Sequence, residues 1–184
     1  SPILAHGFNY SVLYLDLDRR GFPYPIIPLH VNCYGSSVIT AGGAFQHLFE
    51  KPEQNGLPDP PGPNPALCYE VGANLAEALA ESPYRSVIMA SSSWSHCFLS
   101  TNTGYVIPDF ESDRMMLEAL TDGDYETWRG RTMEEVEAAG HHELLNWHVL
   151  AGAMDKLDRK PMIADYVETF IFQSDKCFAA FPPS

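Results

Sequence analysis

The chain has 184 residues, of which 45% are hydrophobic and 19% charged, and its 24 acidic and 11 basic side chains give a net charge of −13 at pH 7. This length and composition predict one globular domain whose core is large enough to need no disulfide or metal for stability. The acidic charge argues against binding to nucleic acid or anionic membrane surfaces, which repel an acidic protein. No run of about eighteen apolar residues is present, so the sequence predicts no membrane-spanning helix.

The N-terminal half alternates between helical and extended patterns. Residues 8–18 are followed by two arginines and a glycine, a signature of a helix end. The short apolar segments 25–34 and 85–90 predict buried strands. An Asn-Pro N-cap followed by apolar residues at i+4 spacing predicts an amphipathic helix over 65–82. The Pro-rich segment 51–65 predicts either a plain surface loop or a lid over a site.

The C-terminal half contains further helix and strand patterns. Thr132 and Glu135 have capping-box spacing and start a helix that Gly140 interrupts. Two more helices and two strands that can pair as antiparallel neighbours are expected over 108–121, 141–157, 161–172 and 176–181. Helices that alternate with hydrophobic strands predict an α/β fold, a sheet with helices on its faces, as a single domain over residues 1–184.

The most informative segment for function is 86–99, in which a hydrophobic strand ends in three serines followed by Trp94 and His96. Ligands of α/β proteins gather beyond the carboxyl ends of strands. A histidine there can act as an acid or base near neutral pH, or it can simply pack beside Trp94. His6, which a glycine follows, allows the same two interpretations, a residue on a turn that faces a pocket or an ordinary turn residue.

Glu143 is a second candidate, because it begins a predicted helix that is apolar nearly all round. A carboxylate on a buried helix must be compensated, either by a metal ion or by the helix's own N-terminal N–H groups. The zinc-protease pattern HExxH is absent, since Asn146 stands where the second histidine would be. The chain also lacks a GxSxG elbow, a P-loop and a GxGxxG motif.

Four motifs occur in order: His6-Gly7, Pro28-Leu29-His30-Val31-Asn32, Ser91-Ser92-Ser93-Trp94-Ser95-His96 and Glu143-Leu144-Leu145-Asn146-Trp147. In these motifs the chain resembles the C-terminal part of the type III extradiol ring-cleavage dioxygenases, the group of the protocatechuate 4,5-dioxygenase β subunit. The chain departs from that group at His30, where relatives have proline, and in serines that replace glycines before Ser-His. The resemblance implies a LigB-like architecture, a mixed sheet flanked by helices on both faces, without its N-terminal portion.

The resemblance also implies roles for particular residues. His96 matches the active-site acid/base, and His6 matches a second active-site histidine that assists proton transfer. Glu143 matches the carboxylate of a two-His, one-carboxylate triad that holds Fe(2+), beside which a catecholate and the co-substrate O2 bind. Ser95 and Asn32 are expected to bind substrate. The implied reaction is meta cleavage of a catechol-type ring, and protocatechuate, gallate, a substituted catechol and 2-aminophenol remain open as substrates.

In the family, the two histidine ligands of the iron lie upstream of the residue that His6 matches. We therefore expect that the chain, which opens on Ser1-Pro2, is cut, and that the N-terminal part of the same protein or a second chain supplies both ligands in a cytoplasmic oligomer. On this view the 184 residues alone do not hold iron tightly. Two alternatives are a non-enzymatic binding module on the same fold and a metal-dependent hydrolase.

Overall fold

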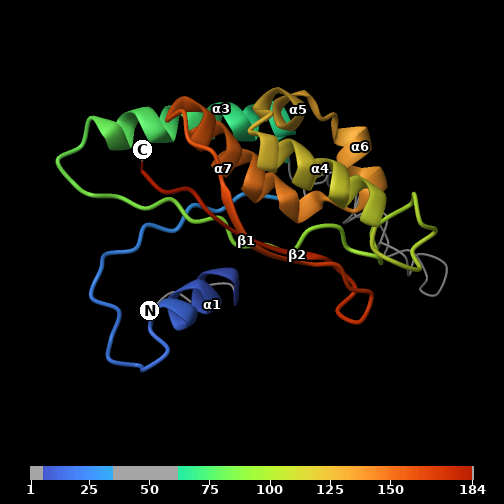
Figure 1. Cartoon of the computed structure of the whole chain (residues 1–184), viewed down its shortest axis with the longest axis horizontal. Coiled ribbons are helices and arrows are strands. Elements are labelled where there is room, and N and C mark those ends of the chain that lie inside the picture. The colour runs from blue at the N-terminus through green and yellow to red at the C-terminus, as the bar shows by residue number, and fades with distance from the viewer. Residues whose placement is uncertain (1–5, 35–61, 184) are drawn as a thin grey trace, which may run out of the picture.

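The structure is a computed structural model that describes residues 6–34 and 62–183 (Figure 1). Its helices are α1 (His6–Leu15), α3 (Pro65–Ala80), α4 (Phe110–Asp122), α5 (Tyr125–Gly130), α6 (Met133–Ala139) and α7 (Leu145–Lys156), with a short 3-10 helix, η2 (His142–Leu144), before α7. The strands β1 (Met162–Val167) and β2 (Lys176–Ala180) pair antiparallel. Most of the Pro-rich segment 51–65 lies outside the described residues.

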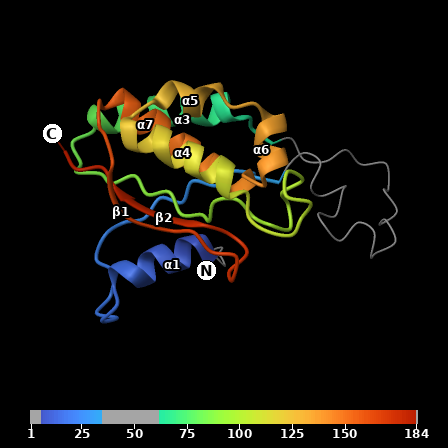
Figure 2. The same cartoon turned by 45° about the vertical axis from the view of Figure 1, so that its right-hand side comes forward.

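The elements form layers around the β1–β2 pair. In both views the two strands lie between α1 on one side and the group of α3, α4, α5 and α7 on the other (Figures 1 and 2). The expected α/β class, with helices on both sides of the strands, is therefore confirmed. Within the described residues the sheet consists of β1 and β2 alone.

Local capping signals place the helix ends. Asn64 caps α3 by accepting the N–H of Leu67, and Pro65 occupies the first turn. Thr132 and its N3 partner form the complete capping box expected at the start of α6. Gly140 ends α6 in the left-handed conformation, with φ 72°, which a residue without a Cβ adopts at little cost. These helices begin and end close to where the sequence predicts them.

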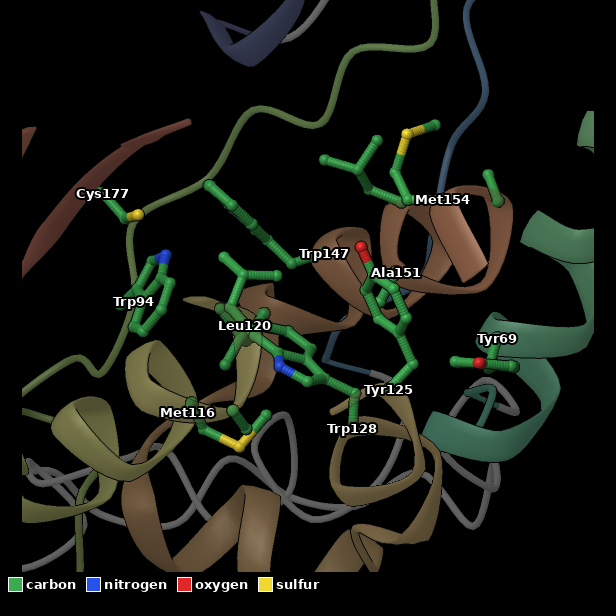
Figure 3. Close-up of a cluster of buried hydrophobic side chains, with 14 of the residues drawn as sticks. Tyr69, Trp94, Met116, Leu120, Tyr125, Trp128, Trp147, Ala151, Met154 and Cys177 are labelled. Carbon is green, nitrogen blue, oxygen red and sulfur yellow. The ribbon is translucent and has the colours of Figure 1, made fainter. Parts of the chain in front are cut away.

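The core is built around the crossing of α3 and α7. A Cβ added to Gly72 would lie 1.8 Å from the Val149 carbonyl oxygen, and one added to Gly152 would lie 2.0 Å from that of Tyr69. The two helices can therefore approach this closely only because both positions are glycine. Around the crossing, buried aromatic and aliphatic side chains fill the space between the helices and the strands (Figure 3).

Two predicted strands do not form. Residues 25–34 and 85–90 run as extended chain without a ladder to another strand among the described residues. The second segment is also not buried as predicted, since Val87 and Met89 are exposed and Ile88 is only half-buried. A strand requires a partner whose N–H and C=O groups lie opposite its own, and an alternating pattern does not supply one.

The structure describes all four cysteines, and each of them is free and buried. Among residues 6–34 and 62–183, no helix is long and apolar enough to cross a membrane.

Candidate active site

The loop that carries His96 is anchored in the core by Trp94, which is fully buried. The Trp94 ring meets Trp128 and Trp147 edge-on, with centroid separations of 6.1 and 5.5 Å (Figure 3). Each aromatic pair of this kind contributes about 0.5–1.5 kcal/mol beyond the burial of its area. The packing of Trp94 therefore fixes the position of the backbone that leads to His96.

Two neighbouring segments hold His96 itself. Its N–H donates to the Gly140 carbonyl oxygen at 3.0 Å, and the next N–H, of Cys97, donates to Gln173 at 2.9 Å. His96 is also paired opposite Ser174 in an antiparallel bridge. A Cβ at Gly140 would lie 2.6 Å from the His96 carbonyl oxygen, so the loop can pass at this distance only because residue 140 is glycine.

His96 and Glu143 meet although 47 residues separate them in sequence. The His96 Nε2 atom lies 3.8 Å from Glu143 Oε2, which is beyond hydrogen-bond distance. The side chains are 12% and 26% exposed, respectively, so solvent reaches both. On its other oxygen, Glu143 accepts a hydrogen bond of 2.5 Å from the Tyr34 hydroxyl. This hydroxyl, rather than a helix N-terminus, is the partner that the structure gives the carboxylate.

Burial decides the protonation of these groups. Burial lowers the pKa of His96, although the nearby negative charge of Glu143 acts in the opposite direction. A neutral imidazole at neutral pH is a base that can accept a proton. Burial and the Glu143 carboxylate both raise the pKa of Tyr34, so its hydroxyl keeps its proton and remains a donor.

His142 packs against Tyr34, the residue that donates a hydrogen bond to Glu143. Its ring stacks on Tyr34 with a centroid separation of 6.0 Å and an interplanar angle of 15°. Neither ring nitrogen has a hydrogen-bond partner among the residues that the structure describes. Burial lowers the pKa of His142 to about 4, so the ring is neutral and packs as an aromatic group against the tyrosine.

The remaining sequence-predicted residues lie at different depths. Ser95 is fully buried, and its hydroxyl donates to Asp113 at 2.5 Å and accepts the Asp109 N–H. Its predicted substrate-binding role stays a prediction, and its hydroxyl has partners inside the protein. Asn32 is exposed, two residues before Tyr34.

His6 is placed only through its backbone. The residue that follows it, Gly7, lies against Ser91, the first of the three serines before Trp94. A Cβ added to Gly7 would be 3.6 Å from the Ser91 carbonyl oxygen. The first turn of α1 therefore adjoins the segment that leads to His96. The role of His6 stays a prediction.

Comparison with known proteins supplies the family. The family described as "Catalytic LigB subunit of aromatic ring-opening dioxygenase" matches residues 59–174. The chain belongs to the LigB family. This assignment makes it part of a family of aromatic ring-opening dioxygenases, which are generally metal-dependent and use O2. No curated protein and no solved structure matches the chain.

A LigB-family metal would need more ligands than this part of the chain provides. Within residues 6–34 and 62–183, no group of three or more His, Cys, Asp or Glu side chains is close enough to hold a metal ion. Glu143 has the donor chemistry of one ligand, a partly exposed carboxylate with one oxygen turned toward His96. His141, next but one to Glu143, instead directs its Nε2 at Asp113.

Two residues that lie close to His96 and Glu143 escaped the sequence analysis. Tyr34 is one, and its proximity to the Val-Asn motif is the only signal that could have identified it. Lys176 is the other. Its ammonium group donates to the Ser174 carbonyl and hydroxyl oxygens. It lies close enough to His96 for its positive charge to lower the pKa of the imidazole, and it interacts electrostatically with Glu143.

Proposed function

We propose that this LigB-family chain is part of a non-haem Fe(II) extradiol dioxygenase that inserts O2 into a catechol-type ring, with cleavage beside the diol. The observation that carries the proposal is the convergence of His96 and Glu143, 3.8 Å apart, from two separate motifs. A base and a partly exposed carboxylate at one edge of the fold suit a substrate that must lose a hydroxyl proton while it binds a metal.

In this proposal His96 takes a proton from a substrate hydroxyl. Its pKa is lowered by burial, so the imidazole is neutral and its Nε2 can accept the proton. The Glu143 charge, 3.8 Å away, then stabilises the imidazolium that forms. His6 and Asn32 are assigned to proton transfer and substrate binding by the family resemblance. Ser95 contributes by shaping the turn that carries His96.

Glu143 is proposed as one of the three iron ligands. Tyr34 holds one carboxylate oxygen and thereby orients the other, as partners of metal ligands commonly do. When bound, the iron would bring the catecholate and O2 together and carry electrons from the ring to oxygen. The two histidine ligands would come from the N-terminal part of the same protein or from a second chain. The free, buried cysteines suit a cytoplasmic enzyme. The oligomer is proposed because LigB-family proteins often oligomerise.

Lys176 favours a substrate with an acidic substituent. Burial lowers the pKa of this ammonium group, although the nearby charges of Asp175, Glu143 and Asp113 act in the opposite direction. Its hydrogen bonds go to Ser174. A half-buried ammonium group can form a charge-assisted hydrogen bond with an anionic ligand. Among the candidate substrates, those with a ring carboxylate would supply that anion.

Oxygen consumption by the complete, iron-loaded protein tests the proposed function. Protocatechuate, gallate, catechol and 2-aminophenol would be supplied in turn to an oxygen electrode, and product would be measured in parallel. We expect one O2 consumed for each ring opened. A metal-dependent hydrolase would consume no O2, and a binding module would bind the aromatic compound without converting it, so either result would contradict the proposal.

A further inference from the structure

Asp113 is a buried carboxylate next to the candidate active site, and the proposed chemistry does not use it. It is fully buried and lies in the first turn of α4. A buried carboxylate is costly unless hydrogen bonds compensate it. Ser95, next to His96, and His141 supply the hydrogen bonds that compensate Asp113.

Asp113 binds both the backbone and the side chain of Ser95. Its Oδ1 atom accepts the Ser95 N–H at 3.1 Å, and its Oδ2 atom accepts the Ser95 hydroxyl at 2.5 Å. The Ser95 hydroxyl in turn accepts the Asp109 N–H at 3.0 Å. The residue immediately before His96 is therefore fixed in both position and orientation.

The Asp113 carboxylate also contacts the segment of Gly140 and His141, which packs against the loop that carries His96. Asp113 Oδ1 lies 2.7 Å from His141 Nε2, and the residue before His141, Gly140, accepts the His96 N–H. One carboxylate thus ties the loop that carries His96 to one of the two segments that hold it, the segment of Gly140 and His141. Because successive side chains of an extended segment point to opposite sides, fixing Ser95 toward α4 turns His96 toward Glu143.

We propose that Asp113 is a positioning residue that sets the orientation of the His96 imidazole in the active site. It acts through Ser95 and His141 and does not touch the substrate. The inference rests on the proposed function insofar as His96 is the acid/base. A misplaced acid/base impairs proton transfer in the transition state more than it impairs binding of the substrate.

Kinetics of the complete, iron-loaded protein test the proposal. Asp113→Asn keeps the volume but leaves a single acceptor oxygen, so we expect kcat to fall roughly tenfold while KM changes less than about twofold. Ser95→Ala, which keeps the N–H bond to Asp113, should lower kcat in the same direction by a smaller factor. Asp109→Asn is the matched control, because its side chain caps the same helix and bonds Asn102 and Ser112.

A spectroscopic measurement separates this proposal from the proposed function. In protein labelled with ¹³C in the histidine rings, the His96 cross-peak, assigned with His96→Phe, should move in Asp113→Asn and Ser95→Ala but not in Asp109→Asn. If the wild-type protein opens no aromatic ring, the proposed function fails, and this cross-peak still decides the role of Asp113. An unmoved His96 cross-peak in Asp113→Asn would overturn the positioning role, whether or not the protein opens an aromatic ring.

Discussion

The two sides of the loop that carries His96 use the same chemical group differently. On the α4 side, Asp113 is fully buried and bonds Ser95 and His141. On the other side, Glu143 is 26% exposed, has one bond to Tyr34 and turns its second oxygen toward His96 at 3.8 Å. Asp113, whose two oxygens both accept hydrogen bonds from protein groups, holds the loop in place. The carboxylate that keeps an oxygen within reach of solvent is available for chemistry.

The largest effect is expected from Glu143→Gln. Loss of the charged ligand should lower iron affinity and turnover by at least about 100-fold, more than the loss of a partner of a ligand. The urea midpoint should hardly change, because the amide oxygen still accepts the Tyr34 hydroxyl. Iron content, turnover and unfolding would be measured on the same preparation. Iron retained at the wild-type level would remove Glu143 from the proposed ligand set.

Replacement of the base comes next. His96→Phe should lower turnover at least about tenfold while iron stays bound, because proton transfer is lost and the ligands are kept. Steady-state kinetics and metal analysis measure the two quantities. Unchanged turnover would show that His96 takes no part in the reaction.

Gly140→Ala tests whether the loop depends on its close approach to α6. The new methyl group would meet the His96 carbonyl oxygen at 2.6 Å, and the left-handed φ of 72° adds strain. We expect the unfolding free energy to fall by about 1–3 kcal/mol. The control is Gly130→Ala, where an added Cβ meets nothing within 4 Å and the change should stay within about 0.5 kcal/mol. Equal effects of the two variants would contradict the packing described here.

The last prediction concerns the pH dependence of stability. Burial lowers the pKa of His148 to about 4, from the ordinary value of 6.5 for histidine. Unfolding therefore takes up a proton between pH 6.5 and 4, and this contribution to stability is lost as the pH falls, by about 1.4 kcal/mol per pH unit for one proton. His148→Asn, whose side-chain N–H can still donate to the Leu144 carbonyl oxygen, should flatten the slope. Parallel urea midpoints for both proteins across this pH range would refute the assignment.

The sequence predicts those parts of the fold that local signals determine. The capping box at Thr132 and the N-cap at Asn64 satisfy helix ends from within a few residues, and both are found as expected. The short helix α5 escaped notice, because its six residues give too little periodicity. The segments 25–34 and 85–90 have strand patterns, yet pairing depends on a distant partner that the pattern does not specify.

The site divides in the same way. His96 and Glu143 could be selected because each lies in a motif, and the structure brings them together. The contact between Tyr34 and Glu143 spans 109 residues, and no spacing rule connects residues so far apart. Asp113 looks in sequence like an ordinary acidic residue in the first turn of a helix. Its bonds to Ser95 and His141 become visible only in three dimensions.

A single-turnover experiment tests the central claim most directly. The complete, iron-loaded protein would be mixed with the preferred catechol under anaerobic conditions and then exposed to O2. With the wild type, the account predicts ring-opened product in an amount equal to the enzyme, and with Glu143→Gln it predicts none. The same yield from Glu143→Gln, or no ring-opened product from the wild type, would contradict it.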